Sequence, residues 1–165
     1  MFERFGEFGS AGEINETAVN LRKEGDMESI RVLAEENGID EEIAEVFIDG
    51  DLLYLCDEMT AAIGKIDVEA AELKPKEIML DWTEYIKVRC SEDGRMAAAV
   101  RNKGKSLKGC IGALLSWSFG HQIPVDGDIL KAAKVNAGKV TLGIPGIGTA
   151  KKIITDYYLG KAGRA

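Results

Sequence analysis

Residues that begin and end helices recur along this 165-residue chain, and they limit its fold more than any other feature. Ser10 precedes Glu13 by three residues, which is capping-box spacing, and the apolar residues that follow have helical periodicity until Gly25. Only residues 139–142 have strand character. We therefore predict a mainly α fold, a bundle of about seven or eight helices with at most one short strand or β-hairpin near residues 138–145. Further candidate N-caps are Asp26, Asp40, Ser106 and Asp126.

Glycine and proline set the expected boundaries in the middle of the chain. After Asp49-Gly50 we expect one helix over residues 52–63 and a short helical segment over residues 68–73. The pair Lys74-Pro75 then predicts a longer helix over residues 75–90, because proline is tolerated in a first turn. The last helix is expected to begin near Thr149 and to end at Gly160.

The two halves of the chain carry opposite charge. Residues 1–82 hold 7 basic and 22 acidic side chains, whereas residues 83–165 hold 14 basic and 6 acidic ones. Charge at this level governs association and solubility and not the fold. We predict an acidic helical lobe over residues 1–82 and a basic helical lobe over residues 83–165. A single compact domain in which both parts share the helix at 75–90 is the alternative.

Hydropathy and the cysteines indicate a cytoplasmic protein with no membrane association. No stretch reaches the ~18 apolar residues that a membrane-spanning helix needs. The first residues lack the basic and apolar segments of a secretory signal. Cys56, Cys90 and Cys110 are an odd number without a Cys-x-x-Cys pair, so we expect buried, reduced thiols rather than disulfide bonds or a zinc site.

The residue types that catalysis needs are scarce. His121 is the only histidine, and Cys110 precedes it by roughly 16 Å along one helix, too far for a hydrogen bond. The carboxylates of Glu41, Glu42 and Glu45 could bind a hard cation, but a solvated helix face is the favoured interpretation. We expect no enzymatic activity, no metal and no cofactor. A metal-dependent nuclease that uses Asp and Glu is an alternative.

Residues 33–44 have the spacing of a helix-turn-helix. Ala34, Gly38 and the apolar residues beyond occupy the positions at which that motif packs its two helices. The second helix is acidic, however, and DNA phosphates would repel it. We therefore predict a helical hairpin whose acidic face binds a basic protein surface. The residues of this face are Glu35, Glu36, Glu41, Glu42, Glu45 and Asp49.

Two features of the second half are candidates for binding phosphate. Residues 143–148 have P-loop glycine spacing, but Thr149 occupies the position of the phosphate-binding lysine. Residues 145–148 resemble the turn of a helix-hairpin-helix, although an ordinary tight turn is the favoured interpretation. The basic run at 101–108 is either a nucleic-acid patch or a counter-charge to the acidic half. The candidate nucleic-acid or phosphate residues are Arg101, Lys103, Lys105, Lys108, Gly146, Gly148, Lys151 and Lys152.

Three segments between residues 103 and 159 resemble the PcfK-like family. They are Lys105-Ser106-Leu107-Lys108-Gly109-Cys110, Val125-Asp126-Gly127-Asp128-Ile129 and Ile154-Thr155-Asp156-Tyr157-Tyr158. These segments are similar to the family's Lys-Ser-aliphatic-x-x-Cys start, its acidic turn before a helix and its paired-tyrosine ending, whereas residues 143–148 are an insertion. The whole chain is also similar to proteins of mobile elements in gut Firmicutes. The resemblance implies an accessory protein of a conjugative element, and some family members inhibit a type II CRISPR nuclease; it implies no catalytic residues.

These observations together predict a non-enzymatic protein of a mobile element that binds a macromolecular partner. The leading hypothesis is an anti-CRISPR inhibitor whose acidic face, over residues 35–58, occupies a basic channel of a CRISPR nuclease as a phosphate mimic. The alternative is a DNA-binding accessory factor of a conjugative element that uses the basic C-terminal half. The sequence leaves the oligomeric state open.

Overall fold

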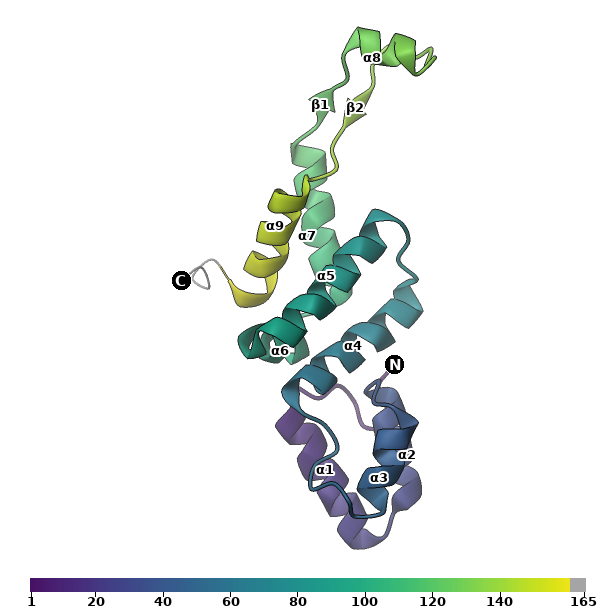
Figure 1. Ribbon diagram of the computed structural model, residues 1–165, viewed down its shortest axis with the longest axis vertical. Helices are drawn as coiled ribbons and strands as arrows, with labels where there is room; N and C mark the ends of the chain where they lie inside the picture. The colour runs from purple at the N-terminus through teal and green to yellow at the C-terminus, as the bar shows by residue number, and fades with distance from the viewer. Residues whose placement is uncertain (161–165) are drawn as a thin grey trace.

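The computed structural model describes residues 1–160 and confirms the mainly α fold. These residues form nine helices, against the seven or eight expected, and one antiparallel sheet of two short strands. The helices are α1 (Ala11–Glu24), α2 (Met27–Glu36), α3 (Glu41–Ile48), α4 (Glu58–Leu73), α5 (Ile78–Glu92), α6 (Gly94–Arg101), α7 (Leu107–Gly120), α8 (Gly127–Ala132) and α9 (Ile147–Leu159), and the strands are β1 (Ile123–Pro124) and β2 (Thr141–Leu142). The molecule is elongated, with α1–α3 at one end and α8 at the other (Figure 1).

The helices begin where the capping residues predicted. The side chain of Ser10 accepts a hydrogen bond from the Glu13 amide, and that of Ser106 accepts one from the Gly109 amide. Asp26, Asp40 and Asp126 cap α2, α3 and α8 in the same way. Gly25 ends α1 in the left-handed conformation, at a φ of 77°. Each start satisfies backbone amides that have no partner inside the helix.

The predicted break between residues 63 and 68 is wrong. Residues 58–73 form the single helix α4, which Asp57 caps through the Thr60 amide. The residues before it form a loop in which Asn15 fixes the backbone: its side-chain oxygen accepts from the amides of Leu55 and Cys56, and its Nδ2 donates to the Cys56 carbonyl. The expected helix over 52–63 therefore begins six residues later than predicted.

The connection from α4 to α5 is also longer than expected. α5 begins at Ile78, so Pro75 lies before the helix and not in its first turn. Lys74 and Glu77 have φ values of 50° and 51°, and these two left-handed positions reverse the chain direction.

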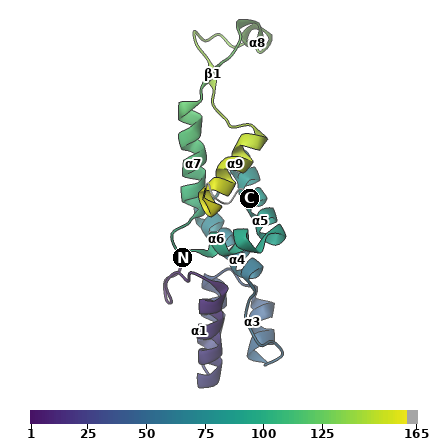
Figure 2. The same cartoon turned by 90° about the vertical axis from the view of Figure 1, so that its left-hand side faces the viewer.

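The strand predicted within residues 138–145 exists as β2, and its partner lies far from it in the sequence. Ile123 pairs with Leu142, and Pro124 pairs with Thr141. The two strands are the stem of an arm, residues 121–146, that carries α8 at its tip and projects beyond α7 and α9 (Figure 2). None of residues 119–144 is buried, so the arm has no core of its own.

The buried apolar side chains form two clusters that meet at α4. Ala61 belongs to a cluster made with α1–α3, whereas Ala62 and Ile66 belong to a cluster made with α5, α6, α7 and α9. The helix common to both clusters is thus α4, while the helix at 78–92 contributes only to the second. Residues 161–165 of the predicted basic lobe lie outside the described residues.

A glycine contact holds the α2–α3 turn against α4. Gly38 has a φ of 65°, which suits glycine, and a Cβ at this position would lie 2.3 Å from the Gly64 carbonyl oxygen. A Cβ on Gly64 would in turn lie 2.2 Å from the Asn37 carbonyl oxygen. Only two residues without side chains allow the turn and the helix to approach this closely.

Replacing Gly64 with alanine is expected to destabilise the protein even though alanine favours helices. The new methyl group would collide with backbone, at a cost of about 1–3 kcal/mol in the free energy of unfolding measured by urea denaturation. The matched control is Gly112→Ala in the middle of α7, where a Cβ meets no atom of residues 1–160 within 4 Å. This control should gain about 0.5–1 kcal/mol. Equal effects of the two substitutions would contradict the proposed contact.

Candidate macromolecule-binding surfaces

The predicted acidic face borders a groove between α2 and α3. The groove has a volume of about 480 Å³, and Glu35 and Glu41 contribute carboxylates to its walls. Ala34, Ile39 and Ala44, which are buried core residues, lie beneath them. The tight turn after α2 brings the two helices together and so places both carboxylates at the same groove.

The six residues of the predicted acidic face divide into two groups. Glu35, Glu41, Glu42 and Asp49 are exposed and make no ion pair with other described residues. Glu45 pairs with Arg31 at 2.5 Å, and the hydrogen bond from Arg31 lowers the pKa of the Glu45 carboxyl. Glu36 accepts hydrogen bonds from the amides of the N-terminal segment, Arg4 at 2.6 Å and Phe5 at 3.1 Å. Four of the six carboxylates therefore remain available to a partner.

The arginines of this end of the molecule bond to its own residues. Residues 1–61 hold 4 basic and 17 acidic side chains, and we call this segment the acidic lobe. The Arg22 guanidinium donates to the carbonyls of Phe47 and Leu52, at 2.7 and 2.9 Å. Arg4 donates to the Ser29 hydroxyl, and Arg31 bonds to Glu45. Of these three arginines, Arg31 also lines the groove, where Glu28 and Glu45 pair with its guanidinium.

The predicted basic patch at 101–108 does not form as one surface. Arg101 is buried, with 1% of its surface exposed, so its assignment to an exposed patch was wrong. The Lys105 ammonium donates to the Tyr157 carbonyl at 2.6 Å and lies 4.8 Å from the centre of that ring. Lys103 lies 3.9 Å from a Glu13 carboxylate oxygen. Arg101, Lys103 and Lys105 thus contact oxygens of the molecule itself, whereas Lys108 is exposed.

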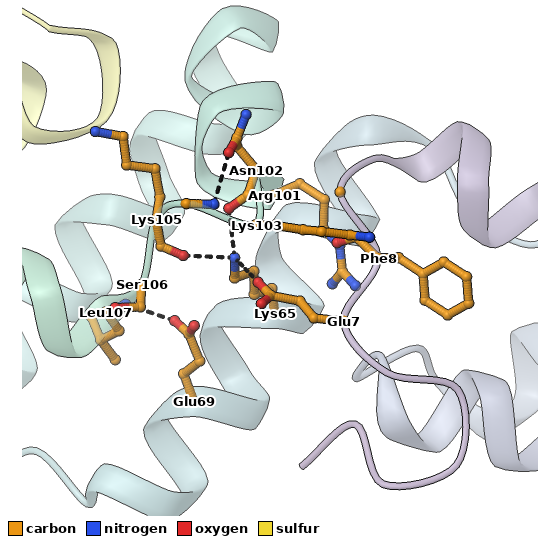
Figure 3. A network of polar contacts seen from close by, with 12 residues as sticks. Glu7, Phe8, Lys65, Glu69, Arg101, Asn102, Lys103, Lys105, Ser106 and Leu107 are labelled. Carbon is orange, nitrogen blue, oxygen red and sulfur yellow. Dashed lines mark hydrogen bonds and ion pairs between the residues drawn. The ribbon is translucent and has the colours of Figure 1, made fainter.

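Arg101 and Lys65 are instead the centre of a buried polar network between the acidic lobe and the rest of the chain (Figure 3). The Lys65 ammonium donates to Glu7 at 2.6 Å and to the carbonyls of Asn102 and Lys105 at 2.9 and 2.8 Å. Burial lowers the pKa of the Arg101 guanidinium, and each of its three nitrogens donates to an oxygen. These acceptors are the carbonyls of Phe8 and Ala61 and the side-chain oxygen of Asn37.

The glycine-rich segment forms a turn before α9. Gly146 is the N-cap of α9 and Gly148 lies in its first turn, and both residues are exposed. The element that precedes this turn is the strand β2, whereas a helix-hairpin-helix requires a helix there. The Lys151 ammonium lies 5.2 Å from the centre of the Tyr85 ring, and Lys152 is exposed.

The groups that sequence analysis considered for chemistry are dispersed. The three cysteines are free and buried, and burial raises the pKa values of Cys56 and Cys90 to about 11 and that of Cys110 to about 12. His121 is exposed and stacks on Trp117 at 4.1 Å. Within residues 1–160, no three His, Cys, Asp or Glu side chains lie together in a way that could hold a metal ion.

An apolar groove that sequence analysis did not anticipate lies at the other end of the molecule. It has a volume of about 350 Å³ and lies between α5, α7 and the loop after β2. Residues 109–125 and 140–150 contain no Asp, Glu, Lys or Arg, and this was the signal available in the sequence. The main apolar residues that line it are Ile78, Met79, Trp82, Ile111, Leu115, Phe119 and Ile144.

Comparisons and hydropathy add two findings. No protein-family model, no curated protein and no solved structure matches this chain. In the part of the chain that the structure describes, no helix combines the length and the apolar character needed to cross a bilayer.

Removing the buried ammonium group is expected to destabilise the protein strongly. Lys65→Met leaves Glu7 and two carbonyls without their donor, and we expect a loss of about 3–5 kcal/mol in the free energy of unfolding. Lys103→Met, which removes an exposed lysine of the neighbouring loop, should change it by less than about 0.5 kcal/mol. Urea denaturation of both variants measures the difference. A Lys65→Met variant as stable as the wild type would refute a structural role for the network.

The carboxyl of Glu69 should lower the stability of the fold as pH rises, whereas most acidic groups raise it. It accepts a hydrogen bond from the Leu107 amide at 2.7 Å, and burial raises its pKa. Because the pKa is higher in the folded than in the unfolded state, protonation of Glu69 stabilises the fold. This contribution is complete below the unfolded pKa, near 4.3, and is lost as pH rises. Glu69→Gln keeps an acceptor for Leu107, so its stability relative to the wild type should increase between about pH 4 and pH 7. Urea denaturation at the two pH values tests the sign, and a relative decrease would contradict it.

Proposed function

We propose that this protein is a non-enzymatic binding protein whose acidic lobe engages a basic surface of a partner protein. The observation that carries the proposal is the division of charge within the lobe. Its arginines bond to carbonyls, a hydroxyl and Glu45, while Glu35, Glu41, Glu42 and Asp49 face solvent. A surface of one sign attracts a partner of the opposite sign over a distance and orients it before contact.

The groove between α2 and α3 supports this proposal with a shape as well as a charge. Glu35 and Glu41 stand on its two helices, so a basic side chain of the partner would meet carboxylates from both sides. An arginine is suited to such a position because its planar guanidinium binds carboxylates through paired hydrogen bonds. The groove therefore favours a partner that presents arginines.

The resemblance of residues 103–159 to PcfK-like proteins supports a more specific partner, a type II CRISPR nuclease. Such a nuclease carries basic channels for its guide and target, and carboxylates on a helical hairpin would occupy a channel as phosphates do. In this proposal the protein acts in the cytoplasm as an inhibitor from a mobile element. Binding alone would suffice, so no catalytic residue of the chain takes part.

A DNA-binding accessory factor is the second candidate function. It is favoured by exposed Lys108 and Lys152 and by the N-terminus of α9, whose first amides follow Gly146. The burial of Arg101 and the internal bonds of Lys105 reduce the positive charge available for phosphate contacts. Protein binding through the acidic lobe is therefore the better supported function.

Neutralising the groove should weaken binding to a guide-loaded type II CRISPR nuclease, measured by biolayer interferometry. We expect the triple variant Glu35→Gln, Glu41→Gln, Glu42→Gln to bind about tenfold more weakly and with a smaller salt dependence. The matched control, Glu77→Gln, Glu84→Gln, Glu92→Gln, removes the same charge beside and within α5 and should bind like the wild type. Equal weakening by both triple variants would refute a role of the groove.

A second measurement separates the two candidate functions. The wild type is titrated against a labelled DNA duplex at about 50 mM and about 200 mM salt, followed by fluorescence anisotropy. The proposed function predicts no binding at either concentration. Binding that falls steeply with salt, and that Lys108→Glu with Lys152→Glu abolishes, would support the DNA-binding factor instead.

A further inference from the structure

Exposed apolar residues line the apolar groove and continue along the chain into the stem of the arm, and we call these residues together the arm surface. Leu115 and Phe119 of α7 are 55% and 76% exposed, and Ile144 of the loop after β2 is 63% exposed. Ile123 and Leu142 stand opposite each other across the two strands, so they share a face of the ladder, and they are 66% and 61% exposed. Ile78 and Met79 complete the surface from α5, at 36% and 39%.

The size of this surface matches a stable interface. A fully exposed large apolar side chain presents roughly 200 Å², so the seven side chains together expose about 800 Å². A standard protein–protein interface buries ≈ 800 Å² on each partner. Monomeric soluble proteins rarely expose apolar patches larger than a few hundred Å², so exposed apolar area of this amount at one end of the molecule indicates an interaction site.

The arm has few internal contacts to stabilise it. Its two strands pair over two residues each, and α8 buries none of its side chains. A two-stranded hairpin of this kind is marginal in water without a surface to pack on. Ile129 and Val135 near the tip are 60% and 46% exposed, so the arm offers apolar side chains to a partner along its whole length.

The charges around the arm surface indicate what kind of partner covers it. Its centre has no charged side chain, and the adjoining hollow is bordered by both Asp81 and Lys151. The arm likewise carries both signs, for example Asp128 bonded to Lys131 at 2.9 Å. A nucleic acid or an anionic membrane would need an excess of positive charge here. A partner that is apolar at its centre and mixed in charge at its margin has the same character as this surface itself.

We propose that a second copy of this chain covers the arm surface, so that the protein is a two-fold symmetric dimer. A two-fold interface places the same patch on both subunits, and it therefore requires a surface that complements itself. The groove supplies the concave part and the projecting arm supplies the convex part within one chain. The acidic lobe lies at the opposite end of the elongated molecule, so dimer formation leaves it free (Figure 1).

The first test is the molar mass in solution, measured by light scattering after size-exclusion chromatography. The wild type should be a dimer at about 50 µM, and Phe119→Glu with Ile144→Glu should raise the dimer dissociation constant at least about 100-fold and give a monomer. The matched control is Leu53→Glu with Tyr54→Glu, which replaces side chains that are 76% and 64% exposed in the acidic lobe. This control should remain a dimer.

The second test locates the contact by cross-linking. Ile123→Cys places an exposed thiol on the arm surface, and a flexible bifunctional maleimide, which can span two thiols that are not in direct contact, should link two chains through it. Glu24→Cys, at the exposed end of α1, should give no linked dimer under the same conditions. The three native cysteines are buried and should not react.

Two results would overturn the proposed dimer. A wild-type monomer at about 50 µM would overturn the proposal and assign the arm surface to a different protein. A dimer that Leu53→Glu with Tyr54→Glu disrupts as strongly as Phe119→Glu with Ile144→Glu would also overturn it. Circular dichroism of each variant establishes that the helices are retained, because the replaced side chains are exposed and contribute little to either core.

Discussion

The position of the acidic lobe depends on one buried cation. Arg101, at the end of α6, reaches across the junction and donates to the N-terminal segment, to the end of α2 and to the start of α4. Because an unpaired buried guanidinium is very costly, each of these three segments is constrained to stay where its oxygen meets this group. Lys65 adds a second set of such bonds from α4 to the loop after α6. The acidic lobe is therefore held in one orientation by hydrogen bonds as well as by apolar packing.

The parts of this fold that could be predicted from the sequence are those that depend on local chemistry. Ser10, Asp26 and Ser106 cap helices through amides three residues away, and local spacing is enough to find them. The helix expected over residues 52–63 instead stops just before Gly64, which lies within α4. Its actual role, contact with Gly38, depends on a turn 26 residues earlier in the chain. The role of a glycine is decided by its distant neighbour, which spacing does not reveal.

The candidate surfaces likewise differ in how well the sequence predicts them. The carboxylates on α2 and α3 could be found because helix periodicity places them outside, and four of the six are exposed. The basic run at 101–108 could not be resolved, because the burial of Arg101 depends on oxygens contributed by residues 8, 37 and 61. The arm surface was visible as two uncharged stretches, but only the fold brings residues 115–123 beside residues 142–144. Charge pattern thus predicts a surface well when helices adjacent in the sequence supply it and poorly when distant segments do.

The division of the core into two clusters has a consequence for how such a protein can change over generations. Substitutions at sites that share no neighbours have additive effects on stability. The groove between α2 and α3 lies on one cluster, whereas the arm surface borders the other through Trp82 and Ile111. A lineage that alters the carboxylates to follow a changing target would therefore not disturb the arm, and the reverse also holds. Substitutions can therefore accumulate at each end of the molecule independently. Because both clusters share α4, this helix should tolerate the fewest.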